Sequence, residues 1–152
     1  MKRFKIVLAL IATIIFISCD SDMDDISLSE AEVNALNQMV RKGEWRISQF
    51  SLNGSDQTAN FDEYLFVFED SNDLSANSSL DQLTGTWRIS NDSGSEFESY
   101  NDVDFNIYFS SNGKLGALTR NYDVISATQN EINLNLDNGE DGDSAILSFS
   151  KN

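Results

Sequence analysis

The sequence predicts an all-β domain, an antiparallel meander closed as a barrel or folded as a sandwich, with one short N-terminal helix. Apolar and polar residues alternate in several short segments, which is typical of strands with one solvated face. Clusters of Asn, Asp, Gly and Ser separate these segments, and no segment suits the crossover helix that parallel strands need. The chain has 152 residues, of which 40% are hydrophobic, and this is enough for one domain with a single core.

Residues 1–18 have the features of a signal peptide. Three basic residues precede an apolar run over 6–17, which is far shorter than the roughly 20 residues of a membrane-spanning helix. The run ends at Ser18 and Cys19, the single cysteine of the chain. This junction resembles the bacterial lipobox, which implies that Cys19 is acylated and anchors a lipoprotein to a membrane. The alternative is an ordinary secretory signal that is cleaved elsewhere and leaves a free thiol.

Residues 19–28 predict an acidic, flexible tether, because the segment is rich in aspartate and poor in residues that could form a core. An acidic stretch directly after the cysteine resembles the surface-export signal of Bacteroidota lipoproteins. The resemblance implies an outer-membrane lipoprotein exposed at the cell surface, with a periplasm-facing location as the alternative. A competing resemblance is to the enterobacterial rule, in which Asp after the cysteine retains a lipoprotein at the inner membrane.

Residues 30–42 predict an amphipathic helix. Ser29 and Glu32 fit a capping box at its start, and Gly43 suits the position that follows its last turn. One stripe of the helix is apolar, so we expect that side to cover the barrel as a plug or lid. The stripe consists of Val33, Leu36, Met39 and Val40.

Five segments alternate apolar and polar residues, and they begin at Trp45, Trp87, Val103, Ile132 and Ala145. A sixth segment, residues 61–69, is largely apolar on both faces, so we expect a central strand or one that the helix covers. The pairs Asn53-Gly54 and Asn112-Gly113 predict tight hairpin turns. The longer polar stretch 92–102 predicts a mobile loop.

The sequence contains one internal repeat, in which residues 43–48 (GEWRIS) recur as residues 85–90 (GTWRIS). One interpretation is a barrel built from two related halves. The other is that Gly-x-Trp is a favourable way to open a strand, because the glycine makes room for the indole ring. The second interpretation is preferred, since little else in the two halves matches.

Gly43 and Trp45, at the first strand after a short helix, resemble the Gly-x-Trp motif of lipocalins and related calycin barrels. The wider pattern resembles the lipocalin-like lipoproteins of Bacteroidota over nearly the whole mature chain, although Tyr122 stands where such chains more often have Trp. The resemblance implies that residues 29–152 form a barrel of about eight antiparallel strands on a lipid tether. Its best segments are WRISQF (45–50), YLFVF (64–68), GTW (85–87) and AILSFSKN (145–152).

A small barrel has an interior that is either filled by side chains or wide enough for one small ligand. In the second case aromatic residues would line a site for a small apolar molecule. The candidates are Trp45, Phe66, Trp87, Phe105 and Tyr122. In the first case the same residues are plain core packing, and the protein is a structural or interaction component of an envelope complex.

The chain carries 25 acidic and 10 basic residues and has no histidine. Such acidity argues against binding to nucleic acid, and the lack of histidine excludes Ser-His or Cys-His catalysis and His-ligated metals. The loop 137–143 could offer oxygen ligands to a hard cation such as Ca²⁺, although a solvated hairpin loop is the simpler interpretation. The residues concerned are Asp137, Glu140, Asp141 and Asp143.

Paired carboxylates would be the remaining route to catalysis. Candidates in or next to the polar stretch 92–102 are Glu96, Glu98, Asp102 and Asp104, and no apolar surroundings there would shift one pKa against another. The sequence therefore predicts a non-catalytic, membrane-anchored module without a cofactor. It would bind a small apolar ligand or an envelope protein.

Overall fold

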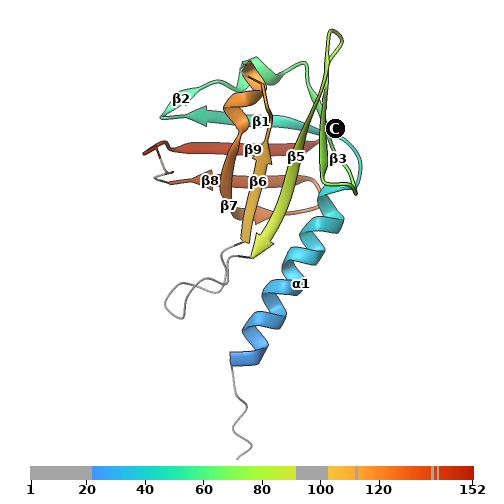
Figure 1. Ribbon diagram of the computed structural model, residues 1–152, viewed down its shortest axis with the longest axis vertical. Coiled ribbons are helices and arrows are strands. Elements are labelled where there is room, and N and C mark those ends of the chain that lie inside the picture. Colours follow the sequence, from blue (N-terminus) through green and yellow to red (C-terminus); the bar gives the residue numbers. More distant parts are fainter. Residues whose placement is uncertain (1–21, 92–102, 112, 138, 140) are drawn as a thin grey trace, which may run out of the picture.

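The computed structural model describes residues 22–91, 103–111, 113–137, 139 and 141–152. Over these residues the chain forms a closed, all-antiparallel barrel of eight strands, with one extra short strand and one N-terminal helix (Figure 1). The predicted meander is confirmed, and it closes as a barrel. The elements are α1 (Asp22–Val40), β1 (Trp45–Leu52), β2 (Ser55–Asp56), η1 (Thr58–Phe61), β3 (Leu65–Phe68), β4 (Asp73–Asn77), β5 (Gln82–Asn91), β6 (Val103–Tyr108), η2 (Lys114–Leu118), β7 (Arg120–Ala127), β8 (Glu131–Leu136) and β9 (Ala145–Lys151).

The barrel closes at β1, which has a neighbour on each side. From β3 to β9 each strand pairs with the next, and β9 then pairs with β1 along nearly its whole length, from Trp45–Lys151 to Leu52–Ala145. On its other side β1 meets β3 at the single pair Trp45–Phe66. A ring of this kind leaves no long unpaired edge, although its two junctions at β1 differ greatly in length.

Helix α1 is longer than the sequence predicted. It begins at Asp22 instead of residue 30, so residues 22–28, which were predicted as flexible tether, are helical, and the capping box does not mark the start. Residues 22–28 contain no glycine or proline, so nothing in this segment prevents the backbone from forming a helix. The helix ends at Val40, and Gly43 follows with a positive φ of 80°.

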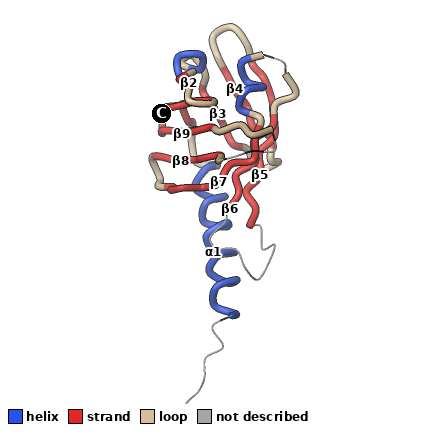
Figure 2. Tube along the Cα trace, turned by 90° about the vertical axis from the view of Figure 1, so that its left-hand side faces the viewer, coloured by secondary structure: helices blue, strands red, loops and turns tan. Residues whose placement is uncertain are grey.

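The predicted apolar stripe of α1 does cover the barrel. Leu36 and Val40 are buried, and Val33 and Met39 pack half-buried against the core. These residues belong to the C-terminal half of α1, which lies at one end of the barrel, while the N-terminal half extends away from it (Figures 1 and 2). The helix is therefore both a cover and a projecting arm.

Two β-bulges keep apolar residues on the inner face of the barrel. In β1, Ser48 is an extra residue between the pairs Ile47–Phe149 and Gln49–Ser148, so Phe50 faces inward three positions after Ile47. In β7, Ile125 is the extra residue, and it is 64% exposed. Bulges of this kind bend a strand and change which side chains face inward, which is why strict alternation fails in both strands.

One predicted turn is confirmed and one is wrong. Asn53 and Gly54 both have positive φ values, 51° and 77°, as the tight hairpin between β1 and β2 requires. Gly113 instead has a φ of -88° and precedes the 3₁₀ helix η2, which connects β6 to β7. Asn112 lies outside the described residues, as does the stretch 92–102 that was predicted as a mobile loop.

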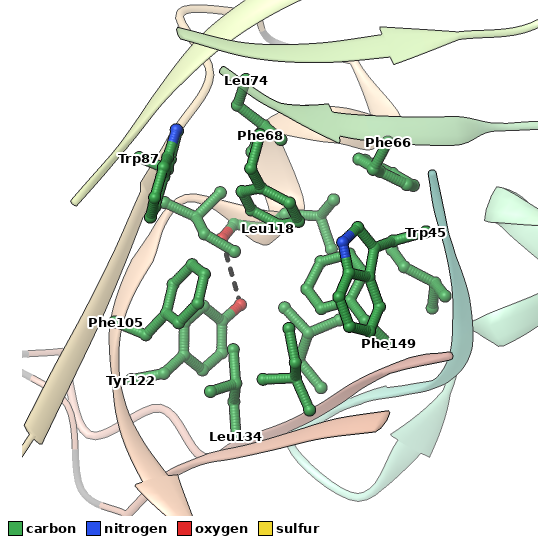
Figure 3. Packing of buried hydrophobic residues seen from close by; sticks show 14 of the residues in the cluster. Trp45, Phe66, Phe68, Leu74, Trp87, Phe105, Leu118, Tyr122, Leu134 and Phe149 are labelled. Atoms are coloured by element: carbon green, nitrogen blue, oxygen red, sulfur yellow. Dashed lines mark hydrogen bonds between the residues drawn. The ribbon is translucent and has the colours of Figure 1, made fainter. Parts of the chain in front are cut away.

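Aromatic rings from opposite strands fill the barrel (Figure 3). The ring of Phe149, from β9, lies 5.5 Å from the rings of both Phe66 and Phe68, centroid to centroid, and nearly perpendicular to each. Edge-to-face contacts of this kind add about 0.5–1.5 kcal/mol per pair to the stabilisation that burial provides. The core is thus a continuous set of interlocking rings across the barrel.

Candidate functional site

The aromatic residues that were predicted to line a ligand site all lie in the barrel interior (Figure 3). The ring of Phe68 reaches into their midst, with its centroid 5.3 Å from Trp87 and 5.6 Å from Phe105. Trp87 and Phe105 also contact each other, with ring centroids 6.0 Å apart. Each is at most 1% exposed: Trp45, Phe66, Trp87, Phe105 and Tyr122.

The two tryptophans of the repeat have similar surroundings. Trp45 Nε1 donates a hydrogen bond to the carbonyl of Val40 at 2.8 Å, and Trp87 Nε1 donates to that of Glu69 at 3.2 Å. Each ring also carries a cation on its face, Lys151 Nζ at 3.9 Å from the centre of the Trp45 ring and Arg41 Cζ at 5.5 Å from that of Trp87. Each indole is thus held by one hydrogen bond and one cation contact.

The two glycines of the repeat, by contrast, serve different purposes. Gly43 has a positive φ of 80°, and a Cβ there would lie 3.1 Å from Lys151 Cε. A Cβ at Gly85 would lie 2.3 Å from the carbonyl oxygen of Tyr108 and 2.6 Å from the ring of Phe109, because β6 approaches β5 closely there. Neither glycine makes room for the indole that follows it, so that part of the interpretation is wrong.

Tyr122 carries the one phenol among these interior residues. Its hydroxyl donates a hydrogen bond to the carbonyl of Leu118, at 3.0 Å, which joins β7 to the end of η2. Burial raises the pKa of this hydroxyl well above its usual range, against an opposing effect of Arg120. Tyr122 is therefore a neutral structural donor at neutral pH.

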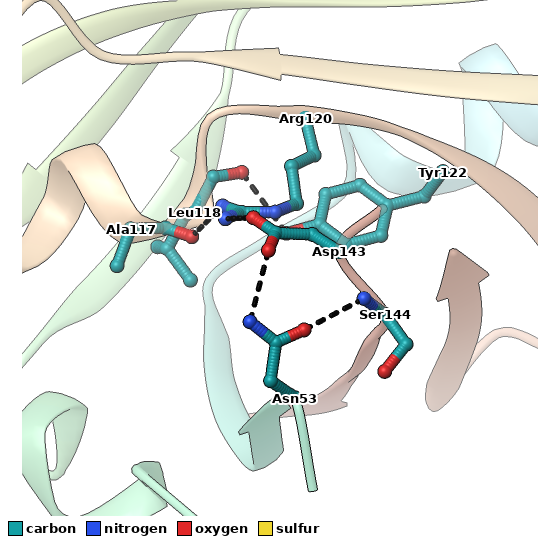
Figure 4. A network of polar contacts seen from close by, with 7 residues as sticks. All are labelled: Asn53, Ala117, Leu118, Arg120, Tyr122, Asp143 and Ser144. Atoms are coloured by element: carbon teal, nitrogen blue, oxygen red, sulfur yellow. Dashed lines mark hydrogen bonds and ion pairs between the residues drawn. The ribbon is translucent and has the colours of Figure 1, made fainter. Parts of the chain in front are cut away.

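Three polar residues connect the loops at one end of the barrel, and we call Asn53, Arg120 and Asp143 the rim network (Figure 4). One oxygen of Asp143 accepts from Arg120 Nη2 at 2.9 Å, and the other accepts from Asn53 Nδ2 at 2.9 Å. Asn53 Oδ1 in turn accepts from the backbone N–H of Ser144. The hydrogen bond from Asn53, followed by that from Arg120, holds the pKa of Asp143 below its usual value.

The rim network borders a surface cleft of about 600 Å³, which Asp137 and Asp141 also line. Within the described part of the chain, no group of three or more acidic or thiol side chains is close enough to hold a metal ion. Asp143 is occupied by Arg120 and Asn53, and Glu140 lies outside the described residues. The described residues of the loop therefore do not assemble the predicted cation site.

Most of the other predicted positions lie outside the described residues, namely the signal segment 1–18, Cys19, Glu96, Glu98 and Asp102. Asp104 lies on β6, where its carboxylate accepts a hydrogen bond from Asn121 on β7 at 3.1 Å. The helix that the structure describes is not apolar enough to span a membrane.

The sequence matches no protein-family model and no curated protein. One solved structure is similar in shape, a crystal structure at 1.00 Å resolution of a DUF4847 family protein from Bacteroides vulgatus. The similarity covers 77% of this chain and 97% of that one, at 13% sequence identity and a TM-score of 0.47.

Proposed function

We propose that the protein is a non-catalytic lipoprotein whose solid barrel presents its outer surface to a partner protein in the cell envelope. One observation supports this most directly, the filling of the interior by the side chains that a ligand would need. Ligand pockets commonly have volumes of roughly 300–1,000 Å³. In this barrel the candidate lining residues are at most 1% exposed, which favours the solid barrel over a small apolar ligand in its interior.

The proposed anchor is an acylated Cys19 at the outer membrane, with the barrel on the cell-surface side. Two or three acyl chains would hold the chain stably, since each buried CH₂ contributes about 0.8 kcal/mol. Helix α1 begins at Asp22, only three residues after the proposed anchor, and has 19 residues. At 1.5 Å per residue its length is about 28 Å, so it would act as an arm between the membrane and the barrel.

The solid barrel is tested by native mass spectrometry of the protein purified from its own envelope. We expect a protein partner to co-purify and no small molecule to remain after the partner is removed. A second measurement titrates benzene, which should not bind to the wild-type barrel but should bind to Phe68→Ala, where a buried ring of the same size has been removed. A small apolar molecule retained by the wild-type protein would contradict the proposal.

The anchor is tested by fractionation and labelling with radioactive palmitate. Cys19→Ala should abolish the label and release the protein from the membrane, while the matched variant Ser21→Ala should remain labelled and membrane-bound. If Cys19→Ala stays in the membrane fraction, the proposed anchor is wrong.

A further inference from the structure

A groove of about 370 Å³ lies beside the C-terminal half of α1, between the helix, the turn from β7 to β8 and the end of β9. Two lysines line it, and no acidic residue is among its described lining residues. Three side-chain amides and an apolar thioether complete the walls. The residues used in the argument are Gln38, Met39, Lys42, Gln129, Asn130 and Lys151.

Lys42 and Lys151 face the same space, and neither forms an ion pair with a described residue. Burial, and then the charge of Lys42, lower the pKa of Lys151. The ion pairs between described residues are Arg41–Asp70 and Arg120–Asp143, and neither lysine takes part in one. The two positive charges therefore repel each other, although the chain has 25 acidic residues. A bound anion would reduce this repulsion.

Lys151 is held in place before any ligand arrives. Its ammonium lies 3.9 Å from the centre of the Trp45 ring, and its backbone pairs with Trp45 across β1 and β9. Gly43 permits this position, because a Cβ there would lie 3.1 Å from Lys151 Cε. Lys42 is exposed, so its side chain can move toward a ligand at little cost.

The C-terminus of α1 would ordinarily repel an anion, since its last carbonyls carry partial negative charge. Two of these carbonyls already accept hydrogen bonds. The carbonyl of Val40 accepts from Trp45 Nε1 at 2.8 Å, and that of Met39 accepts from the backbone N–H of Lys42 at 3.2 Å. These hydrogen bonds partly neutralise the negative end of the helix dipole.

We propose that this groove binds a phosphate group carried by a small organic molecule. The two ammonium groups would neutralise the phosphate, the amides of Gln38, Gln129 and Asn130 would donate hydrogen bonds, and Met39 would contact the organic part. The phosphate belongs either to a soluble phosphate ester or to a lipid headgroup. This site does not depend on the solid barrel or on acylation of Cys19.

The first test titrates inorganic phosphate, and then glycerol 3-phosphate, into the intact protein at constant ionic strength while amide resonances are followed by NMR. We expect saturable shifts at Gln38, Gln129 and Asn130. Lys42→Gln should weaken binding about tenfold, because one of two charges is lost. The matched control, Lys114→Gln, removes an exposed lysine of η2 and should leave binding unchanged.

A second arm uses vesicles of phosphatidylglycerol and of phosphatidylcholine to identify the source of the phosphate. A lipid headgroup is the source if the protein binds phosphatidylglycerol vesicles more strongly than phosphatidylcholine vesicles. In that case Lys42→Gln should remove the difference and Lys114→Gln should retain it. Saturable shifts with glycerol 3-phosphate and no preference between the vesicles assign a soluble ester. The proposal is overturned if none of these probes binds saturably, or if the two variants weaken binding equally.

Discussion

The ammonium nitrogen of Lys151 lies 3.9 Å from the centre of the Trp45 ring, at the strand pair where the barrel closes. Trp45 also pairs with Phe66 of β3 and donates to the carbonyl of Val40 at the end of α1. One residue thus connects the first strand, the last strand, β3 and the helix. Because Lys151 lies beside Trp45 and also lines the groove, the pKa of Lys151 should respond to changes in the charge of the groove.

Replacement of Lys42 by Gln should raise the pKa of Lys151. The pKa is lowered by burial and by the charge of Lys42, and the substitution removes the second cause. Because the pKa of Lys151 is lower in the folded chain, the charged lysine destabilises the native state. The contribution of Lys151 to the free energy of unfolding should therefore rise as pH approaches the unfolded value of 10.5 from below. NMR titration of the Lys151 side chain measures the shift, and an unchanged pKa in Lys42→Gln would show that the two groups do not interact.

Replacement of Asn53 by Ala should raise the pKa of Asp143 toward 3.8, because the hydrogen bond from Asn53 is the main cause of its lowering. A carboxyl with a lowered pKa stabilises the native state above the unfolded pKa, and this contribution is lost as pH falls through the folded value. The variant should therefore lose less stability than wild type on acidification. Carbon-13 NMR of the Asp143 carboxyl gives the pKa, and the matched control is Asn121→Ala, which removes an amide that donates to Asp104 instead.

Replacement of Tyr122 by Phe should lower the free energy of unfolding by about 1–2 kcal/mol, since the Leu118 carbonyl loses its buried donor. The raised pKa of Tyr122 adds a pH dependence. Wild type should lose stability as pH rises above about 10, where the phenol of Tyr122 ionises only in the unfolded chain. Tyr122→Phe should show a smaller loss, because the raised pKa of Tyr64 still contributes. Urea denaturation at pH 7 and pH 11 measures both effects, and identical pH profiles would refute the second.

Replacement of Phe68 by Ala should cost about 3–5 kcal/mol, because Phe68 contacts Trp87, Phe105 and Phe149 at the centre of the core. If the barrel is rigid, the deletion leaves a dry cavity that takes up xenon or benzene. Uptake can be followed by a rise in melting temperature under xenon pressure. Wild type should show no such rise, and equal responses of the two proteins would argue against a filled interior.

Replacement of Gly85 by Ala should destabilise the protein by about 1–3 kcal/mol, since the added methyl would meet the Tyr108 carbonyl and the Phe109 ring. Gly113→Ala is the matched control, because its φ is -88° and the nearest atom to its Cβ would be 3.7 Å away. Thermal unfolding compares the two. A neutral Gly85→Ala would mean that β5 and β6 separate easily at this point.

Much of the barrel could be predicted from alternation along single strands. Trp87, Phe105 and Leu134 have the same inward direction that their spacing indicates, because the side-chain period of a strand is fixed. Two strands gave weak signals for physical reasons. The bulge at Ile125 breaks the alternation in β7, and β4 has the mostly polar sequence DLSAN, in which Leu74 and Ala76 alone supply apolar inward side chains.

The polar features could not be predicted in the same way. Asn53 and Asp143 are separated by 90 residues and meet only because β1 pairs with β9. Lys42 and Lys151 likewise come from the two ends of the barrel sequence. Local patterns carry no information about such pairs, because the barrel closure that brings them together is itself a long-range contact.

The unequal junctions of β1 have a consequence for how the barrel opens. Between β1 and β9 an opening must break a long ladder of hydrogen bonds, whereas between β1 and β3 it must break a single residue pair. Local opening follows the route that loses the fewest buried contacts. The amide protons of β3 that face β1 should therefore exchange with solvent before the amide protons of β9 that face β1. The junction between β1 and β3 is thus the place where the closed barrel opens most easily.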